Sequence, residues 1–228
     1  MRPETLHGRV LKGAGSQLEL AHNDGSHDFA HVSRVVALAK SLAKEEGLSE
    51  GETRVAELAA LLHDVKDWKY SGDAEAGVRA ADELLTSRGC DASVVDAVKH
   101  VIRNVGFKDS LGGGPVNVTP ALAVVQDADR LDAIGAIGIA RCFAYGGSRA
   151  TPLWDPSEGR ADATAPPPTK EGYMKTNRTR SSVAHFGDKL LRLKSMLKTP
   201  SGRRRAEARH AFMELYLSQF YDEWEGRA

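Results

Sequence analysis

The fold is decided by the stretch Leu58-Ala59-Ala60-Leu61-Leu62-His63-Asp64. This apolar run of good helix formers ends in an imidazole next to a carboxylate. A helix this apolar is normally buried, and a buried charge is costly unless it is paired or bound to a metal. An adjacent His-Asp pair at the end of a core helix therefore predicts a bound cation, with further ligands elsewhere in the chain.

The composition excludes several classes of protein. Lys and Arg number 31, as do Asp and Glu, so the 228-residue chain has a formal net charge of zero and no basic excess for nucleic acid or membrane surfaces. Two cysteines, Cys90 and Cys142, make no disulfide framework. No apolar run is long enough for a signal peptide or a bilayer span. We expect a cytoplasmic protein without a nucleic-acid or membrane partner.

Apolar residues recur at helical spacing in most of the chain, and no segment alternates as a half-buried strand would. The predicted fold is all-α. The predicted helices cover about 28–46, 49–64, 74–87, 91–102, 119–145, 181–197 and 203–225.

Start signals support three of these helices. Ser49 followed three residues later by Glu52 is a capping-box pattern. Thr119-Pro120 places a cap residue before a proline at the first helical position. Asp91 can cap the helix that follows it.

Residues 146–170 are rich in Gly, Pro, Asp and Ser, which is typical of a long surface loop. We interpret them as a loop inside one domain, and the pattern does not decide whether the loop closes over a site. The predicted domain spans 1–228, with a core of about 25–145 that the helices of 171–228 complete.

Further ligands for the cation can be found in two other predicted helices. His31 lies 32 positions before His63, a distance that fits two antiparallel helices and a turn. Asp129 lies in the otherwise apolar segment 124–132, on the helix face of Val125. Two imidazoles and two carboxylates facing the interior of a helical bundle would form a mixed nitrogen and oxygen site for a divalent metal.

The ordered motifs resemble those of the HD-domain metal-dependent phosphohydrolases, and most closely their bacterial YedJ/YpgQ-like branch. The resemblance rests on His27-Asp28-Phe29-Ala30-His31-Val32-Ser33-Arg34-Val35, on the His63-Asp64 pair, on Gln126-Asp127-Ala128-Asp129-Arg130-Leu131-Asp132-Ala133-Ile134-Gly135-Ala136-Ile137-Gly138, and on the segment from His185 to Leu191. It implies an HD-domain helical bundle with additional C-terminal helices. It also implies that His31, His63, Asp64 and Asp129 are the metal ligands.

The resemblance further implies hydrolysis of (deoxy)nucleoside triphosphates to the monophosphate and pyrophosphate. Four protein ligands on a six-coordinate ion leave two positions, an arrangement that favours manganese, with cobalt, magnesium, zinc and iron as alternatives. Asp67 resembles the acid that assists the attacking water in other HD enzymes, and Lys69 is a candidate phosphate clamp. His185 and Lys189, expected as i, i+4 partners on one helix face, are candidates for the far side of a phosphate pocket.

Other interpretations remain open at the level of the sequence. The four proposed ligands can instead form a buried hydrogen-bond network. Asp67 can be a solvated acid at a helix end, and Lys69 an ordinary surface lysine. The enzyme can be a nucleoside monophosphate phosphatase, or the chain a nucleotide-sensing module without turnover. A homodimer is compatible with the sequence, which does not fix the oligomeric state.

Several neighbouring polar residues are expected to have roles other than direct binding of the metal. We expect Asp127 and Asp132 to be exposed or supporting acids. We expect His100 to be a histidine of the core or pocket wall, and Arg130 to reach solvent.

Overall fold

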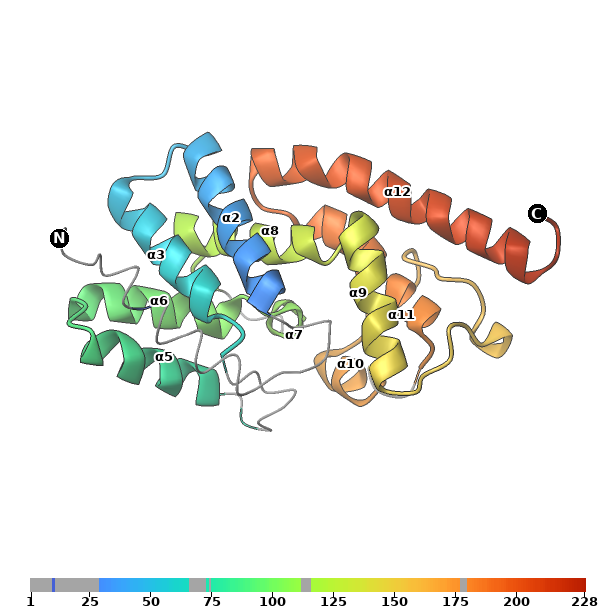
Figure 1. Ribbon diagram of the computed structural model, residues 1–228, viewed down its shortest axis with the longest axis horizontal. Helices are drawn as coiled ribbons and strands as arrows, with labels where there is room; N and C mark the ends of the chain where they lie inside the picture. The colour runs from blue at the N-terminus through green and yellow to red at the C-terminus, as the bar shows by residue number, and fades with distance from the viewer. Residues whose placement is uncertain (1–9, 11–28, 66–72, 74, 112–115, 177–179) are drawn as a thin grey trace. The chain divides into compact units, whose positions relative to one another are not determined.

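The arrangement of the helices is seen in a computed structural model, which describes residue 10 and residues 29–65, 73, 75–111, 116–176 and 180–228. These residues form helices joined by turns and loops, with no strand among them, and this confirms the predicted all-α fold (Figure 1). In this described part of the chain, no helix is both long and apolar enough to cross a membrane.

The chain divides into two compact units, Met1–Asp129 and Arg130–Ala228. The division falls inside α8 (Pro120–Asp132), between Asp129 and Arg130. The prediction of one domain over 1–228 is not tested by this division, since a domain can contain more than one compact unit.

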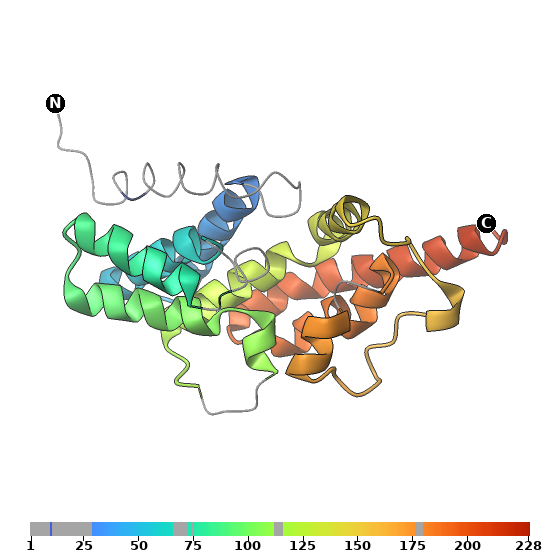
Figure 2. The same cartoon turned by 90° about the horizontal axis from the view of Figure 1, so that it is seen from below.

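The first unit is a helical bundle. Besides α8, the described residues of this unit form α2 (Phe29–Glu45), α3 (Glu50–Leu62), α5 (Ala76–Ser87), α6 (Ala92–Asn104) and the short α7 (Phe107–Ser110). Helix α3 packs against α2 and α6, and α5 packs against α6 (Figures 1 and 2). The apolar stripes meet in a core that includes Val35, Leu42, Leu58, Leu61, Leu62 and Val98.

Helix α3 begins with the predicted capping box. The Ser49 Oγ accepts a hydrogen bond from the backbone N–H of Glu52, and the Glu52 carboxylate accepts one from the backbone N–H of Ser49 at 3.0 Å. Helix α6 also begins where predicted, at Ala92. The Asp91 side chain, however, makes no capping hydrogen bond with any described residue, so its predicted capping role is wrong.

The helix predicted over 119–145 is in fact two helices, because α8 ends at Asp132 and α9 covers Gly135–Ser148. Gly135 has a φ of +76°, a left-handed conformation that glycine adopts at little cost. At Gly138 the backbone of the break comes so close that a Cβ would lie 2.2 Å from the Ala133 carbonyl oxygen. Two glycines thus allow the helix to break inside the HD-like motif of residues 126–138.

The second unit is built on a long C-terminal helix. Helix α12 (Pro200–Trp224) packs against α9 and against the 3₁₀ helix η2 (Leu190–Met196). Helix α11 (Ser182–Asp188) packs on the same two elements, and α10 (Lys170–Thr176) precedes it. The sequence patterns did not predict α10. The single helix predicted over 181–197 is wrong, because the chain leaves the helical region at Lys189 (φ −137°, ψ −62°) and continues as η2.

The segment between α9 and α10 is attached to its own unit by several contacts. It contains one short 3₁₀ helix, η1 (Pro156–Glu158). The Tyr221 hydroxyl accepts a hydrogen bond from the Ala161 N–H at 2.8 Å, and the Glu158 carboxylate accepts one from the Ser181 hydroxyl at 2.5 Å. Trp154 packs edge-on against Tyr221, with ring centroids 5.0 Å apart. Hydrogen bonds and a ring contact therefore hold this segment to the rest of the second unit.

Candidate metal centre

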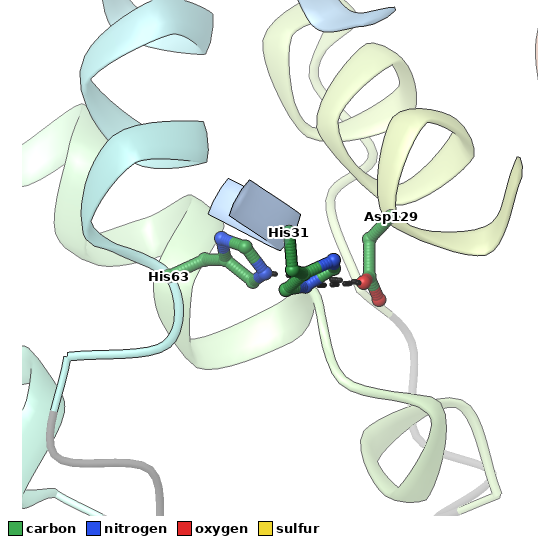
Figure 3. A group of neighbouring side chains, drawn as sticks. All are labelled: His31, His63 and Asp129. Atoms are coloured by element: carbon green, nitrogen blue, oxygen red, sulfur yellow. Dashed lines mark ion pairs between the residues drawn. The ribbon is translucent and has the colours of Figure 1, made fainter. Parts of the chain in front are cut away.

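The candidate centre lies entirely within the first unit. His31 lies in the first turn of α2, His63 is the C-cap residue of α3 and Asp64 follows it, while Asp129 lies in the last turn of α8. Three helices thus bring together residues that are far apart in the sequence. Figure 3 shows His31, His63 and Asp129 converging from these elements.

The ligand atoms lie close to one another. The Nε2 atom of His31 is 3.7 Å from Asp129 Oδ1, and the Nε2 atom of His63 is 3.8 Å from the same oxygen. One ligand atom from each of these residues fits within a mutual distance of 4.8 Å. The two carboxylate oxygens of Asp64 lie 3.2 Å from His31 Nε2 and 3.5 Å from His63 Nε2.

All four residues therefore meet, although Asp64 is not part of the group of three that satisfies the mutual-distance limit. Ligand atoms around an ion at about 2.1 Å lie about 3.0 to 3.4 Å apart. The separations given above, 3.2 to 3.8 Å, are close to these values, so His31, His63 and Asp129 could hold one ion, with Asp64 directly beside them.

The orientation of His63 identifies the charge that the centre needs. Its Nδ1 atom lies 2.7 Å from the carbonyl oxygen of Ala60, which can only accept, so Nδ1 carries a proton. In the neutral ring, Nε2 then presents a lone pair. This atom is buried and has no hydrogen-bond partner in the described part of the chain, while it faces the carboxylates of Asp64 and Asp129.

A hydrogen-bond network explains this geometry poorly. If Nε2 of His63 were protonated, a bond to a carboxylate would be about 2.7–2.9 Å long, yet the two carboxylate oxygens lie 3.5 and 3.8 Å away. The Nε2 lone pair of His63 and the carboxylate oxygens that it faces are all acceptors, so they do not hydrogen-bond to one another. The residues present therefore fit a divalent cation.

Burial differs across the centre. The side chains of His31 and His63 are 1% and 3% exposed, whereas that of Asp129 is 27% exposed. The rings meet edge to face, with centroids 5.3 Å apart. The imidazoles are thus buried in the core, and Asp129 is the side of the centre that is most exposed to solvent.

Comparison with known proteins identifies the family. The sequence profile of the HD domain matches residues 28–134. The protein YpgQ of Bacillus subtilis (strain 168) is 34% identical over 202 residues, which are 88% of this chain and 85% of the relative. The chain belongs to the HD family. As an HD protein, it is a metal-dependent phosphohydrolase, and HD domains bind divalent metals.

Solved structures of HD relatives have the same architecture. A Lactobacillus plantarum protein has a TM-score of 0.82 at 32% identity, covering 99% of this chain and 100% of its own. An HD-superfamily hydrolase from Bacillus thuringiensis has a TM-score of 0.68 at 34% identity and covers 96% of both chains. Bacillus subtilis YpgQ in complex with ADP has a TM-score of 0.71 at 30% identity and covers 97% of this chain and 100% of its own.

The other candidate residues of this HD protein are Asp67, Lys69, His185 and Lys189, with His27 as a neighbouring histidine. Asp67, Lys69 and His27 fall outside the described residues. His185 and Lys189 belong to the second unit, where the rings of His185 and Tyr173 have centroids 6.3 Å apart. Because α11 ends at Asp188, the expectation that His185 and Lys189 share one helix face is wrong.

Three of the polar neighbours are more buried than expected. Arg130 is 2% exposed and donates a hydrogen bond from Nη1 to the Met196 carbonyl at 2.6 Å, so it does not reach solvent. Asp127 is fully buried, and Asp132 is buried in an ion pair with Arg141 at 3.0 Å. These groups are part of the interior of the HD fold.

His100 makes a hydrogen bond to the backbone of the segment before α8. Its Nε2 atom lies 2.8 Å from the carbonyl oxygen of Asn117, in the segment that leads into α8. A ring nitrogen that donates to a carbonyl has no lone pair for a metal. The contact agrees with the interpretation of His100 as a histidine of the core or pocket wall.

Proposed function

We propose that this HD protein hydrolyses (deoxy)nucleoside triphosphates to the monophosphate and pyrophosphate, with manganese held by His31, His63, Asp64 and Asp129. The observation that carries the proposal is the buried His63 Nε2 lone pair facing two carboxylates. The nucleotide part is supported by the crystal structure of the relative YpgQ in complex with ADP.

The side chains have separate tasks in this chemistry. The Ala60 carbonyl fixes the His63 tautomer, so Nε2 is already aimed at the ion before binding. The two carboxylates balance the charge of a divalent cation. A divalent ion held by these residues would supply Lewis-acid chemistry, lowering the pKa of bound water and polarising a phosphoryl oxygen. The partly exposed Asp129 marks the side from which a substrate can approach.

The remaining roles follow from the family resemblance. We assign Asp67 as the base that takes a proton from the attacking water, and Lys69 as a point-charge clamp on the phosphates. His185 and Lys189 remain candidates for the far side of the phosphate pocket. A mixed nitrogen and oxygen ligand set with room for water and substrate favours manganese over closed tetrahedral zinc. We place the enzyme in the cytoplasm, as one domain over 1–228 and compatible with a homodimer.

The test is a product analysis on metal-stripped protein. The protein is reloaded separately with Mn²⁺, Co²⁺, Mg²⁺, Zn²⁺ or Fe²⁺, and pyrophosphate and orthophosphate release are followed in parallel on nucleoside triphosphates and monophosphates. We expect pyrophosphate from triphosphates, fastest with Mn²⁺, and no release by His63→Ala. Orthophosphate from monophosphates would replace the proposed reaction with a phosphatase. Nucleotide binding without turnover under any metal would favour a sensor.

A further inference from the structure

Gln126 is a buried polar residue to which the sequence motifs assign no role. It lies on α8 and is 4% exposed. Its Nε2 donates a hydrogen bond at 2.6 Å to the main-chain oxygen of Asn104. Because Asn104 is the last residue of α6, that carbonyl has no partner inside its own helix. The bond therefore gives the carbonyl of Asn104 its donor and links α6 to α8.

This bond also fixes the orientation of the amide. If the Gln126 amide were turned over, its oxygen would lie against the carbonyl oxygen of Asn104, and two acceptors would face each other at hydrogen-bond distance. The Nε2 atom must therefore point at Asn104. The Oε1 atom, on the other arm of the amide, then points away from that carbonyl.

The Oε1 atom of Gln126 is a buried acceptor without a hydrogen-bond partner in the described part of the chain. Buried amide oxygens in native proteins are nearly always paired, so each exception needs an explanation. Leaving such a group unpaired is costly. A donor that arrives with a ligand would remove this cost.

The position of Gln126 indicates which ligand. Gln126 precedes Asp129 by three residues on the same helix, so the two side chains are neighbours on one face. Asp129 is the member of the metal centre that faces solvent. Gln126 therefore lies about one helical turn from the residue that marks the solvent side of the centre.

The chemistry of an amide oxygen limits what it can bind. It accepts hydrogen bonds, and so do the oxygens of an ionised phosphate, so the two repel each other. An N–H or O–H group is needed, and in a nucleotide such groups are carried by the base and the sugar. We propose that Gln126 Oε1 accepts a hydrogen bond from the nucleoside part of the substrate and so determines specificity, an inference that rests on the proposed nucleotide phosphohydrolase function.

The test compares two substrates of the manganese-loaded enzyme, a nucleoside triphosphate and inorganic triphosphate. In Gln126→Met the acceptor is replaced by an unbranched apolar side chain. We expect KM for the nucleoside triphosphate to rise about tenfold, the effect of one hydrogen bond, while KM for inorganic triphosphate and the Kd for Mn²⁺ stay unchanged. Because both substrates meet the same folded protein, a partial loss of folding would lower both activities equally. Gln219→Met, the same change on the exposed face of α12, is the matched control.

A second measurement changes the substrate and compares the wild type with Gln126→Met. Triphosphates that lack one sugar hydroxyl, exocyclic amino group or ring N–H at a time are compared in the wild type and in Gln126→Met, and the binding of non-hydrolysable analogues is measured by calorimetry. One deletion should weaken binding about tenfold in the wild type and have no effect in the variant, as coupled partners do. A series without any such coupling would overturn the proposal.

The remaining outcomes separate this inference from the function on which it rests. An equal rise of KM for both substrates in Gln126→Met would show that Gln126 acts on the phosphate or metal side, which overturns its role in specificity, whereas a smaller folded fraction lowers both rates and leaves both KM values unchanged. A wild type that neither binds nor hydrolyses nucleotides contradicts the proposed function and the inference together. A wild type that hydrolyses them with a KM insensitive to Gln126→Met contradicts the inference alone.

Discussion

At the scale of single residues, the centre depends on negative charge that is only partly shielded from water. Asp129 is the most exposed of the four proposed ligands, and its Oδ1 faces both histidine Nε2 atoms. Asp129→Asn keeps the shape of the side chain and removes its charge. We expect the Kd for Mn²⁺ to rise about a hundredfold, measured by calorimetry, because a neutral amide is a weaker ligand for a divalent ion.

The control for Asp129→Asn is Asp96→Asn, the same change at a 78% exposed carboxylate on α6. Its Kd for Mn²⁺ should equal that of the wild type. If both variants weaken binding to the same extent, the effect comes from the overall charge of the protein and not from ligation by Asp129.

Cys142 should be chemically inert in the folded protein. Desolvation is the main cause that raises the pKa of its thiol to about 12. At pH 8 only about one thiol in ten thousand would then be the reactive thiolate. We expect alkylation of Cys142 by iodoacetamide, followed by mass spectrometry, to be much slower in native protein than in urea. Equal rates in the two conditions would contradict this prediction.

Residue chemistry and the order of the family motifs together gave the four proposed ligands of the centre. A histidine and an aspartate at the end of an apolar run conflict with burial unless a cation is present, and the motif order supplied the partners. The role of Gln126 did not follow from the sequence, because a glutamine in a helix carries no such conflict until the partners of its two amide atoms are known. Its spacing to Asp129 was the only available signal.

At the scale of elements, the start of α3 depends on Ser49. The backbone N–H of Glu52 donates to its hydroxyl oxygen. We expect Ser49→Ala to lower the free energy of unfolding by about 1 kcal/mol in urea titrations, since a lost helix cap typically has this effect. A change within experimental error would mean that tertiary packing alone holds the start of this helix.

The same capping box should respond to acid. The hydrogen bond from the Ser49 side chain is the main cause that lowers the pKa of Glu52 below its usual value. A lowered pKa in the folded state means that this stabilisation is complete above the unfolded pKa of glutamate and is lost as the pH falls through the folded one. The stability difference between wild type and Ser49→Ala should therefore narrow as the pH is lowered through that range. A constant difference would contradict the proposed interaction.

The break between α8 and α9 depends on two glycines. A Cβ at Gly138 would lie 2.2 Å from the Ala133 carbonyl oxygen, whereas nothing lies within 4 Å of one at Gly147 on the same helix. We expect Gly138→Ala to lower the free energy of unfolding by about 2 kcal/mol or more. Gly147→Ala, its matched control, should be neutral or stabilising by up to about 1 kcal/mol. Equal effects in thermal unfolding would show that the close approach at Gly138 is not limiting.

Local patterns predicted where helices begin better than where they are interrupted. A capping box is complete within four residues, so the start of α3 could be predicted from Ser49 and Glu52. The apolar spacing through Leu131, Ile134 and Ile137 continues across the break after Asp132 and hides it. The same holds for the end of α11, where Leu190 and Leu193 keep a helical spacing although the backbone turns at Lys189.

At the scale of the whole molecule, the sequence predicted the fold class because periodic apolar faces determine it. It did not predict that residues from Arg130 onward form a compact unit of their own, since that depends on contacts between distant segments. The hydrogen bond from the Ala161 N–H to the Tyr221 hydroxyl joins residues 60 positions apart, and no local pattern predicts it.

That hydrogen bond gives a prediction for the segment between α9 and α10. Tyr221→Phe removes the hydroxyl and keeps the ring that packs against Trp154. We expect hydrogen exchange at the Ala161 amide to become about tenfold faster, as the loss of one hydrogen bond implies. Exchange that is equally fast in both proteins would show that this segment moves freely in solution.

The central claim is that His31, His63, Asp64 and Asp129 form one divalent metal site, and it is tested most directly by metal stoichiometry. Metal-stripped wild type and His63→Ala are titrated with Mn²⁺, and helical content is followed by circular dichroism. We predict one tightly bound ion per wild-type chain and none per His63→Ala chain, with unchanged helical content. A His63→Ala protein that binds Mn²⁺ as tightly as the wild type would contradict the claim.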